Sequence, residues 1–183
     1  MIHYFTETSG RIVVSTSAED VSWSQPKLSD AVNPKFREMV RLWHDPVDEM
    51  GTEYRIPEPW LWAIMWAESQ GDPNAKSEKG AMGLMQVMPF HFKEGESPYD
   101  PRTNLRASCR YLVTVRAKVG SDLVRAGSMY NAGGPFTNES WIASGRNPSF
   151  TTRWGYPAQP KYLDRVVAAN NTFLSLGTSV TQA

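Results

Sequence analysis

The 183-residue sequence has few of the side chains that form metal sites and disulfides. Its single cysteine, Cys109, excludes an internal disulfide framework. Cys109 falls on the apolar face of a predicted helix, so we expect a buried, unreactive thiol. The three histidines, His3, His44 and His91, are scattered and do not have the spacing of metal ligands. We therefore expect no metal, no other cofactor and no disulfide.

An excess of charge of one sign is also missing. The 19 basic residues balance the 19 acidic ones, so the formal net charge is zero. Composition thus gives no reason to expect binding to nucleic acid or to an anionic membrane surface. No apolar run approaches the length of a membrane span. Residues 1–8 contain no basic segment leading into an apolar run, so we expect no standard export signal.

The length of the chain predicts one compact domain with a single core. Residues 1–32 are rich in Ser, Thr and charge, with one short strand expected at 11–16. We interpret them either as an extended N-terminal arm or as an attachment segment for a larger assembly. The compact domain is expected to span 33–176, and 177–183 form a polar tail.

Several helices can be predicted from their starting signals and apolar spacing. Asn33 precedes a proline and Asp100 precedes another, which is the pattern of an N-cap before the first helical turn. The sequence predicts helices from 33 through the forties, at 57–70, at 100–120, at 121–132 and from 160 onward, with a further short helix at 138–144. Along the last long one, an apolar face is expected from Tyr162, Val166, Ala169 and Phe173.

The helix at 57–70 places an acid on an apolar face. Two prolines suit its first turn, and a glycine with a proline two positions later ends it. A stripe with helical spacing runs along it and ends in a carboxylate: Leu61, Ile64, Met65 and Glu68. We therefore expect Glu68 to face the interior from the last helical turn.

This position favours the protonated form of Glu68. The negative end of the helix dipole and partial burial both raise the pKa of a carboxyl group. A carboxyl that is neutral near pH 7 can donate a proton to a glycosidic oxygen. Taken alone, however, a glutamate at a helix end is more often a solvated surface residue.

The segments that follow make the pattern specific. Ser69 directly follows Glu68, and Ser77 lies nine residues after it. The run at 80–89 reads Gly-Ala-Met-Gly-Leu-Met-Gln-Val-Met-Pro, and residues 130–133 read Tyr-Asn-Ala-Gly. Gly80 and Gly83 permit backbone conformations that a side chain would forbid. Leu84 and Met85 within this run are expected in the core.

Together these motifs resemble the soluble lytic transglycosylase family, which is similar in fold to goose-type lysozyme. The resemblance covers roughly residues 56–173. It implies a mainly α, lysozyme-like helical domain with at most a small strand element. The catalytic residues that it implies are Glu68, Tyr130 and Ser77, with Tyr130 and Ser77 holding the acid. The substrate-binding residues that it implies are Gln86, Met88, Asn131, Ser69 and Tyr162.

One position departs from the family pattern. Many members have a glutamate four residues before the tyrosine that corresponds to Tyr162, whereas this chain has Ala158 there. The contribution of that glutamate, which we take to be contacts with substrate, is missing or replaced.

The resemblance implies cleavage of the bond between N-acetylmuramic acid and N-acetylglucosamine with formation of 1,6-anhydro ends. Two alternatives stay open. A lysozyme on the same fold would use water, with a second carboxylate supplied by Asp72, Glu78, Glu94 or Asp100. A glycan-binding or structural virion component would have kept the fold without activity.

Expected partners are peptidoglycan glycan strands. Because a standard export signal is not expected, a phage protein is one interpretation: it is made in the cytoplasm, then carried by a virion or released through a membrane pore to the cell wall. The N-terminal arm would then contact other virion or tail proteins.

Overall fold

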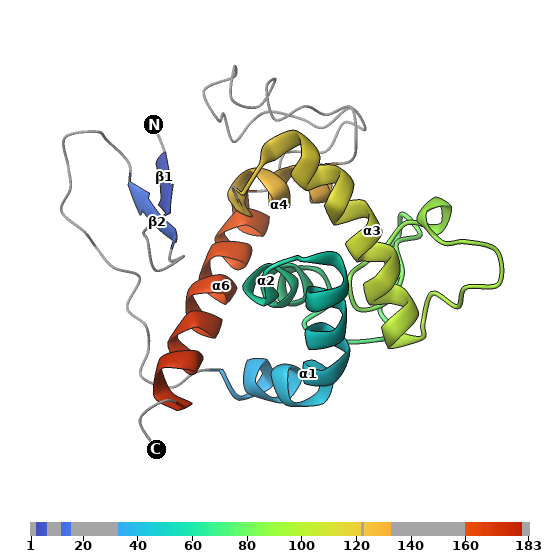
Figure 1. Cartoon of the computed structure of the whole chain (residues 1–183), viewed down its shortest axis with the longest axis horizontal. Helices are drawn as coiled ribbons and strands as arrows, with labels where there is room; N and C mark the ends of the chain where they lie inside the picture. Colours follow the sequence, from blue (N-terminus) through green and yellow to red (C-terminus); the bar gives the residue numbers. More distant parts are fainter. Residues whose placement is uncertain (1–2, 7–11, 16–32, 122, 133–159, 181–183) are drawn as a thin grey trace.

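The computed structural model describes residues 3–6, 12–15, 33–121, 123–132 and 160–180, and the structural statements below concern these residues. The chain is mainly helical, as predicted (Figure 1). Its elements are β1 (His3–Thr6), β2 (Ile12–Ser15), α1 (Pro34–Tyr54), α2 (Glu58–Glu68), the 3-10 helix η1 (Pro89–His91), α3 (Pro101–Val119), α4 (Leu123–Ala132) and α6 (Pro160–Val180).

Helix α2 lies at the centre of the molecule. Figure 1 looks along it and shows α1, α3, α4 and α6 around it. The sequence predicts one buried stripe, but the helix is enclosed on almost every side. Trp62 and Ala63, which lie outside that stripe, are as fully buried as Ile64 within it. Trp62 also stacks on Phe173 of α6, with ring centroids 5.8 Å apart. Enclosure of this kind fixes where the last turn of α2 lies.

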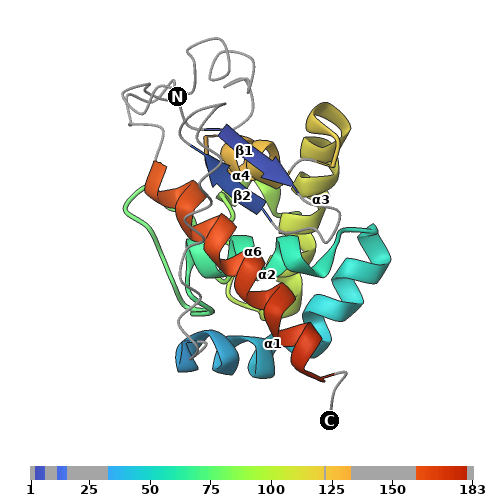
Figure 2. The same cartoon turned by 90° about the vertical axis from the view of Figure 1, so that its left-hand side faces the viewer.

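Helix α1 begins as predicted and then bends. The Asn33 side chain accepts a hydrogen bond from the Lys35 amide at 2.9 Å, which caps the first turn. The helix contains Pro46, and Figures 1 and 2 both show a change of direction partway along it. A proline inside a helix removes one backbone hydrogen bond and kinks the axis. The second half of α1 therefore runs along α3.

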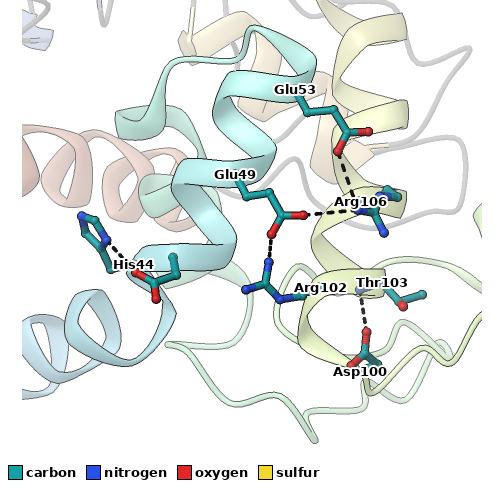
Figure 3. Close-up of polar contacts among 8 residues, drawn as sticks. His44, Glu49, Glu53, Asp100, Arg102, Thr103 and Arg106 are labelled. Atoms are coloured by element: carbon teal, nitrogen blue, oxygen red, sulfur yellow. Dashed lines mark hydrogen bonds and ion pairs between the residues drawn. The ribbon is translucent and has the colours of Figure 1, made fainter.

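Ion pairs join α1 and α3 at the surface (Figure 3). Arg102 pairs with Glu49, while Arg106 lies 3.5 Å from Glu49 and 3.6 Å from Glu53. Helix α3 itself starts after Asp100, whose carboxylate accepts the Thr103 amide at 2.8 Å, as the sequence predicts. These contacts are all at least partly open to solvent.

Cys109 on α3 is fully buried, as expected. Burial raises the pKa of its thiol to about 12, so the group stays protonated and unreactive.

Two features of the structure differ from the prediction. The strand expected at 11–16 is present as β2, but β1 pairs with it antiparallel, and the sequence analysis did not identify that partner. The tail expected from 177 is helical up to Val180, where α6 ends. The helix expected at 138–144 and Ala158 lie outside the described residues. Within the described ranges, no helix is long and apolar enough to cross a membrane.

Candidate active site

Glu68 is the last residue of α2, where the sequence predicts an inward-facing acid. Burial raises the pKa of its carboxyl group to about 7, and two nearby groups, the Tyr162 hydroxyl and the Arg165 charge, oppose that rise. Burial outweighs both. The carboxyl group is enclosed by protein, while the residue as a whole is only partly buried. A carboxyl group in this state can be protonated or ionised near neutral pH.

Tyr162 reaches Glu68 from α6, which packs against α2. The side chain is 2% exposed, and its hydroxyl makes no hydrogen bond of regular geometry within the described part of the chain. The hydroxyl nevertheless acts on the Glu68 carboxyl as a donor that favours the ionised form. Tyr162 is thus buried beside the acid, and its implied contact with substrate stays a prediction.

Tyr130 approaches the same carboxyl group from α4. Burial and the charge of Glu68 both raise the pKa of the Tyr130 phenol well above its ordinary value. Its hydroxyl donates to the Met85 carbonyl at 2.8 Å and lies 3.0 Å from the Ser108 hydroxyl. Because a phenol has one proton to give, Ser108 is the donor in the second contact. The sequence analysis missed Ser108, which is fully buried on α3.

The side chains of Ser69 and Ser77 both make hydrogen bonds to backbone groups of the loop after α2. Ser69 donates to the Leu84 carbonyl at 2.6 Å and accepts from the Gly71 amide at 3.1 Å. These contacts tie the end of α2 to the loop, and the implied contact of Ser69 with substrate stays a prediction. The Ser77 hydroxyl oxygen accepts from the Ala81 amide at 3.0 Å. That bond does not use the hydroxyl proton, so an effect of Ser77 on Glu68 stays a prediction.

Asn104 on α3 organises the loop after α2, and the sequence analysis did not identify it. It is fully buried, accepts from the Met85 amide at 2.8 Å, and donates to the carbonyls of Met82 and Pro98 at 2.8 Å each. Gly83 adopts φ +75, and a Cβ there would lie 2.3 Å from the Asn104 amide nitrogen. The predicted need for glycine at this position is confirmed.

The residues implied as sugar ligands lie on this loop and on α4. Gln86 donates both amide protons to backbone, to the carbonyls of Ala75 and Gly83 at 3.0 Å each. Its side-chain oxygen is therefore the atom suited to accept from a sugar hydroxyl. Met88 is partly exposed just before η1, and Asn131 is exposed on α4.

Leu84 and Met85 are fully buried, which confirms their predicted place in the core.

The other acids considered for a second carboxylate have different surroundings. Asp72 accepts the Asn74 amide at 2.9 Å, and Asp100 caps α3. Glu78 and Glu94 are exposed. Among the described residues, the side chains that influence the Glu68 pKa are Tyr162 and Arg165, and neither is a carboxylate. In the same ranges, no group of three or more His, Cys, Asp or Glu side chains is arranged to hold a metal ion.

Comparison with known proteins identifies the family of this chain. Residues 45–152 match the family model described as Transglycosylase SLT domain. The chain is 34% identical over 101 residues to the soluble lytic murein transglycosylase of Escherichia coli (strain K12), covering 49% of this chain and 16% of that protein. It is 28% identical over 96 residues to the membrane-bound lytic murein transglycosylase E of Buchnera aphidicola subsp. Acyrthosiphon pisum, covering 45% of this chain and 43% of that protein. The chain thus spans less than half the length of either relative.

Solved structures give the same fold. The 70-kDa soluble lytic transglycosylase in complex with bulgecin A superposes with a TM-score of 0.64 at 23% identity, covering 78% of this chain and 26% of that one. The structure of the 70-kDa soluble lytic transglycosylase from Escherichia coli gives a TM-score of 0.59 at 26% identity, covering 74% and 24%. The predicted lysozyme-like helical fold is confirmed.

Proposed function

We propose, from the premise that this chain belongs to the Transglycosylase SLT domain family, that it is a peptidoglycan lytic transglycosylase. It would cleave the β-1,4 bond between N-acetylmuramic acid and N-acetylglucosamine and leave a 1,6-anhydro ring on the muramic acid. The observation that carries the proposal is the enclosed carboxyl group of Glu68, whose pKa of about 7 suits both halves of such a reaction.

In the first half, protonated Glu68 gives its proton to the glycosidic oxygen. The bond from that oxygen to the muramic acid C1 breaks, and N-acetylglucosamine leaves with its new hydroxyl group. Positive charge then develops at C1, and the N-acetyl group of the same sugar stabilises it. Burial supports this step because it keeps the Glu68 proton in place at neutral pH.

In the second half, ionised Glu68 takes the proton from the C6 hydroxyl of the muramic acid. The C6 oxygen attacks C1 and closes the anhydro ring, so the carboxyl group is protonated again and no water is consumed. The Tyr162 hydroxyl and the Arg165 charge both favour the ionised carboxylate, which supports a base at this stage. One residue therefore serves as acid and then as base.

Among the described residues, the Glu68 pKa responds to burial, a hydroxyl group and a cation, which is consistent with a reaction that uses one carboxyl group. Hydrolytic enzymes place a second carboxylate opposite the acid, where it acts as nucleophile or activates water. Asp100 is engaged as a helix cap, which argues against it as that second group. The hydrolytic alternative therefore needs an acid other than Asp100 as its second carboxylate.

The test is mass spectrometry of soluble fragments after digestion of purified peptidoglycan. Wild-type protein is expected to leave anhydro-muramyl ends, and Glu68→Gln is expected to leave none. Glu49→Gln is the matched control, since it changes an exposed glutamate on α1. Reducing ends, heavier by one water, would instead assign a lysozyme. Folded wild-type protein that releases no fragments would leave glycan binding or a structural role.

The setting of the activity is a separate prediction. Local wall degradation by a phage, with the N-terminal arm attaching the enzyme to virion proteins, would be supported by co-purification of the chain with intact particles.

A further inference from the structure

Phe90 is the most exposed large apolar side chain among the described residues, with 75% of its surface accessible. It lies on η1, two residues after Met88 and four after Gln86. Isolated exposed apolar residues are common and need no explanation. What distinguishes Phe90 is the structure beneath it, which links it to the acid and holds it in place.

A continuous series of rings runs from Phe90 toward Glu68. The ring centroids of Phe90 and His91 are 4.5 Å apart, and those of His91 and Tyr111 are 4.4 Å apart. The ring centroids of Tyr111 and Tyr130 are 5.3 Å apart, and the charge of Glu68 contributes to the raised pKa of Tyr130. Phe90 is therefore the outer end of a series of ring contacts whose inner end, Tyr130, lies beside the acid.

The segment that carries Phe90 is fixed to α3 by Arg110. The guanidinium group donates to both carboxylate oxygens of Glu96, at 3.0 and 2.6 Å, and to the His91 carbonyl at 3.2 Å. Glu96 also accepts the Lys93 amide at 2.8 Å. Bidentate hydrogen bonds between an arginine and a carboxylate fix the relative orientation of the two groups and also add stability. An exposed aromatic ring on such a support is preorganised for a ligand.

The chemistry of this surface suits a neutral sugar ring. Burial and the neighbouring Arg110 charge lower the pKa of His91, so its imidazole is uncharged at neutral pH. The exposed part is therefore an uncharged aromatic face. Pyranose rings present one side made of C–H groups, which packs on an aromatic face, while their hydroxyl groups stay in water.

We propose that Phe90, supported by His91 and Tyr111, is an outer stacking site for one sugar ring of the glycan strand. This inference rests on the proposed function and deepens it. It extends the binding surface beyond the predicted ligands Gln86 and Met88. It also makes affinity depend on strand length, because only a strand long enough to reach η1 gains the contact.

The test measures binding by calorimetry in the Glu68→Gln background, with peptide-free peptidoglycan glycan strands separated by length as the probe. Adding Phe90→Ala is expected to weaken binding of long strands about tenfold, and to have less effect as the strands are shortened. Phe90→Tyr keeps an aromatic face and is expected to retain affinity within about twofold. The matched control is Leu42→Ala, which removes another exposed apolar side chain, on α1.

Equal affinity of Phe90→Ala and its parent at every strand length would overturn the inference, as would an equal loss in Leu42→Ala. Melting temperatures within about 2 °C of the parent would show that each variant is folded. The proposed function fails separately: wild-type protein would then release no fragments, and the parent would bind no strand of any length.

Discussion

Two regions of the molecule contain glutamates in opposite settings. At the end of α2, burial around Glu68 outweighs its interactions with Tyr162 and Arg165. Between α1 and α3, Glu49 and Glu53 stay partly exposed and pair with Arg102 and Arg106 (Figure 3). The first setting favours the protonated form of a glutamate near neutral pH, and in the second the glutamates join two helices.

The difference teaches that access to solvent decides what a glutamate does here. An exposed pair gains little because water screens both charges. Ionisation is unfavourable for an enclosed acid without a closely paired cation. The carboxyl group therefore keeps its proton near neutral pH and can donate it. Substitutions in each region can therefore test whether burial determines the role of the glutamate.

The largest expected effect is the loss of activity in Glu68→Gln. The glutamine amide has nearly the same shape as the carboxyl group, but it can neither donate nor remove the required proton. Fragment release from peptidoglycan should fall by about a thousandfold or more. Glu49→Gln should retain activity within about twofold. Comparable losses in the two variants would remove the distinction between the regions.

The next effect concerns the buried network that shapes the loop beside Glu68. Asn104→Ala leaves the Met85 amide and the carbonyls of Met82 and Pro98 without their present partner. We expect the free energy of unfolding to fall by about 3 kcal/mol, measured by urea denaturation. Asn131→Ala on the exposed surface of α4 is the control and should change it by about 0.5 kcal/mol or less. Similar values for both would show that the network contributes little.

The third effect is a gain in stability when the acid is neutralised. Below the unfolded-state pKa of 4.5, Glu68 is protonated in both states and burial has no pH-dependent cost. Between pH 4.5 and the folded-state pKa of about 7, the unfolded state ionises while the folded state keeps its proton, so stability falls across this window and the full cost remains above it. Glu68→Gln removes that cost. It should therefore stabilise the protein by up to about 3 kcal/mol at pH 8 and not at pH 4. Thermal unfolding over this pH range would reveal no such trend if the carboxyl group were solvated.

The smallest effect is expected at the surface ion pairs. Replacing Glu49 and Glu53 together by glutamine should lower the free energy of unfolding by about 1 kcal/mol or less per pair. The loss should shrink further in high salt, because the pairs are exposed. A large loss that salt does not reduce would show that these glutamates, too, are effectively buried.

Sequence reasoning located the parts of this fold that depend on local signals. The Asp100 cap, the limits of α2 and the position of Glu68 follow from residues close to them in the chain. Leu84 and Met85 were correctly placed in the core.

The sequence could not supply contacts between distant segments. Ser108 is 22 residues from Tyr130 and Asn104 is 19 from Met85, so no local pattern marks either bond. Burial of Tyr162 beside Glu68 depends on how α6 packs against α2, which the sequence of α6 by itself does not show. A strand pairing such as that of β1 with β2 is likewise not recorded in either strand by itself.

The central claim is that enclosure keeps Glu68 protonated near neutral pH. The most direct test is a carbon-13 NMR titration of the glutamate side-chain carboxyl groups, with Glu68→Gln used to assign the signal that disappears. The account predicts a midpoint of about 7 for Glu68. A midpoint near the ordinary value of 4.5 would contradict it, because the carboxyl group would then be ionised at neutral pH and could not act as the acid.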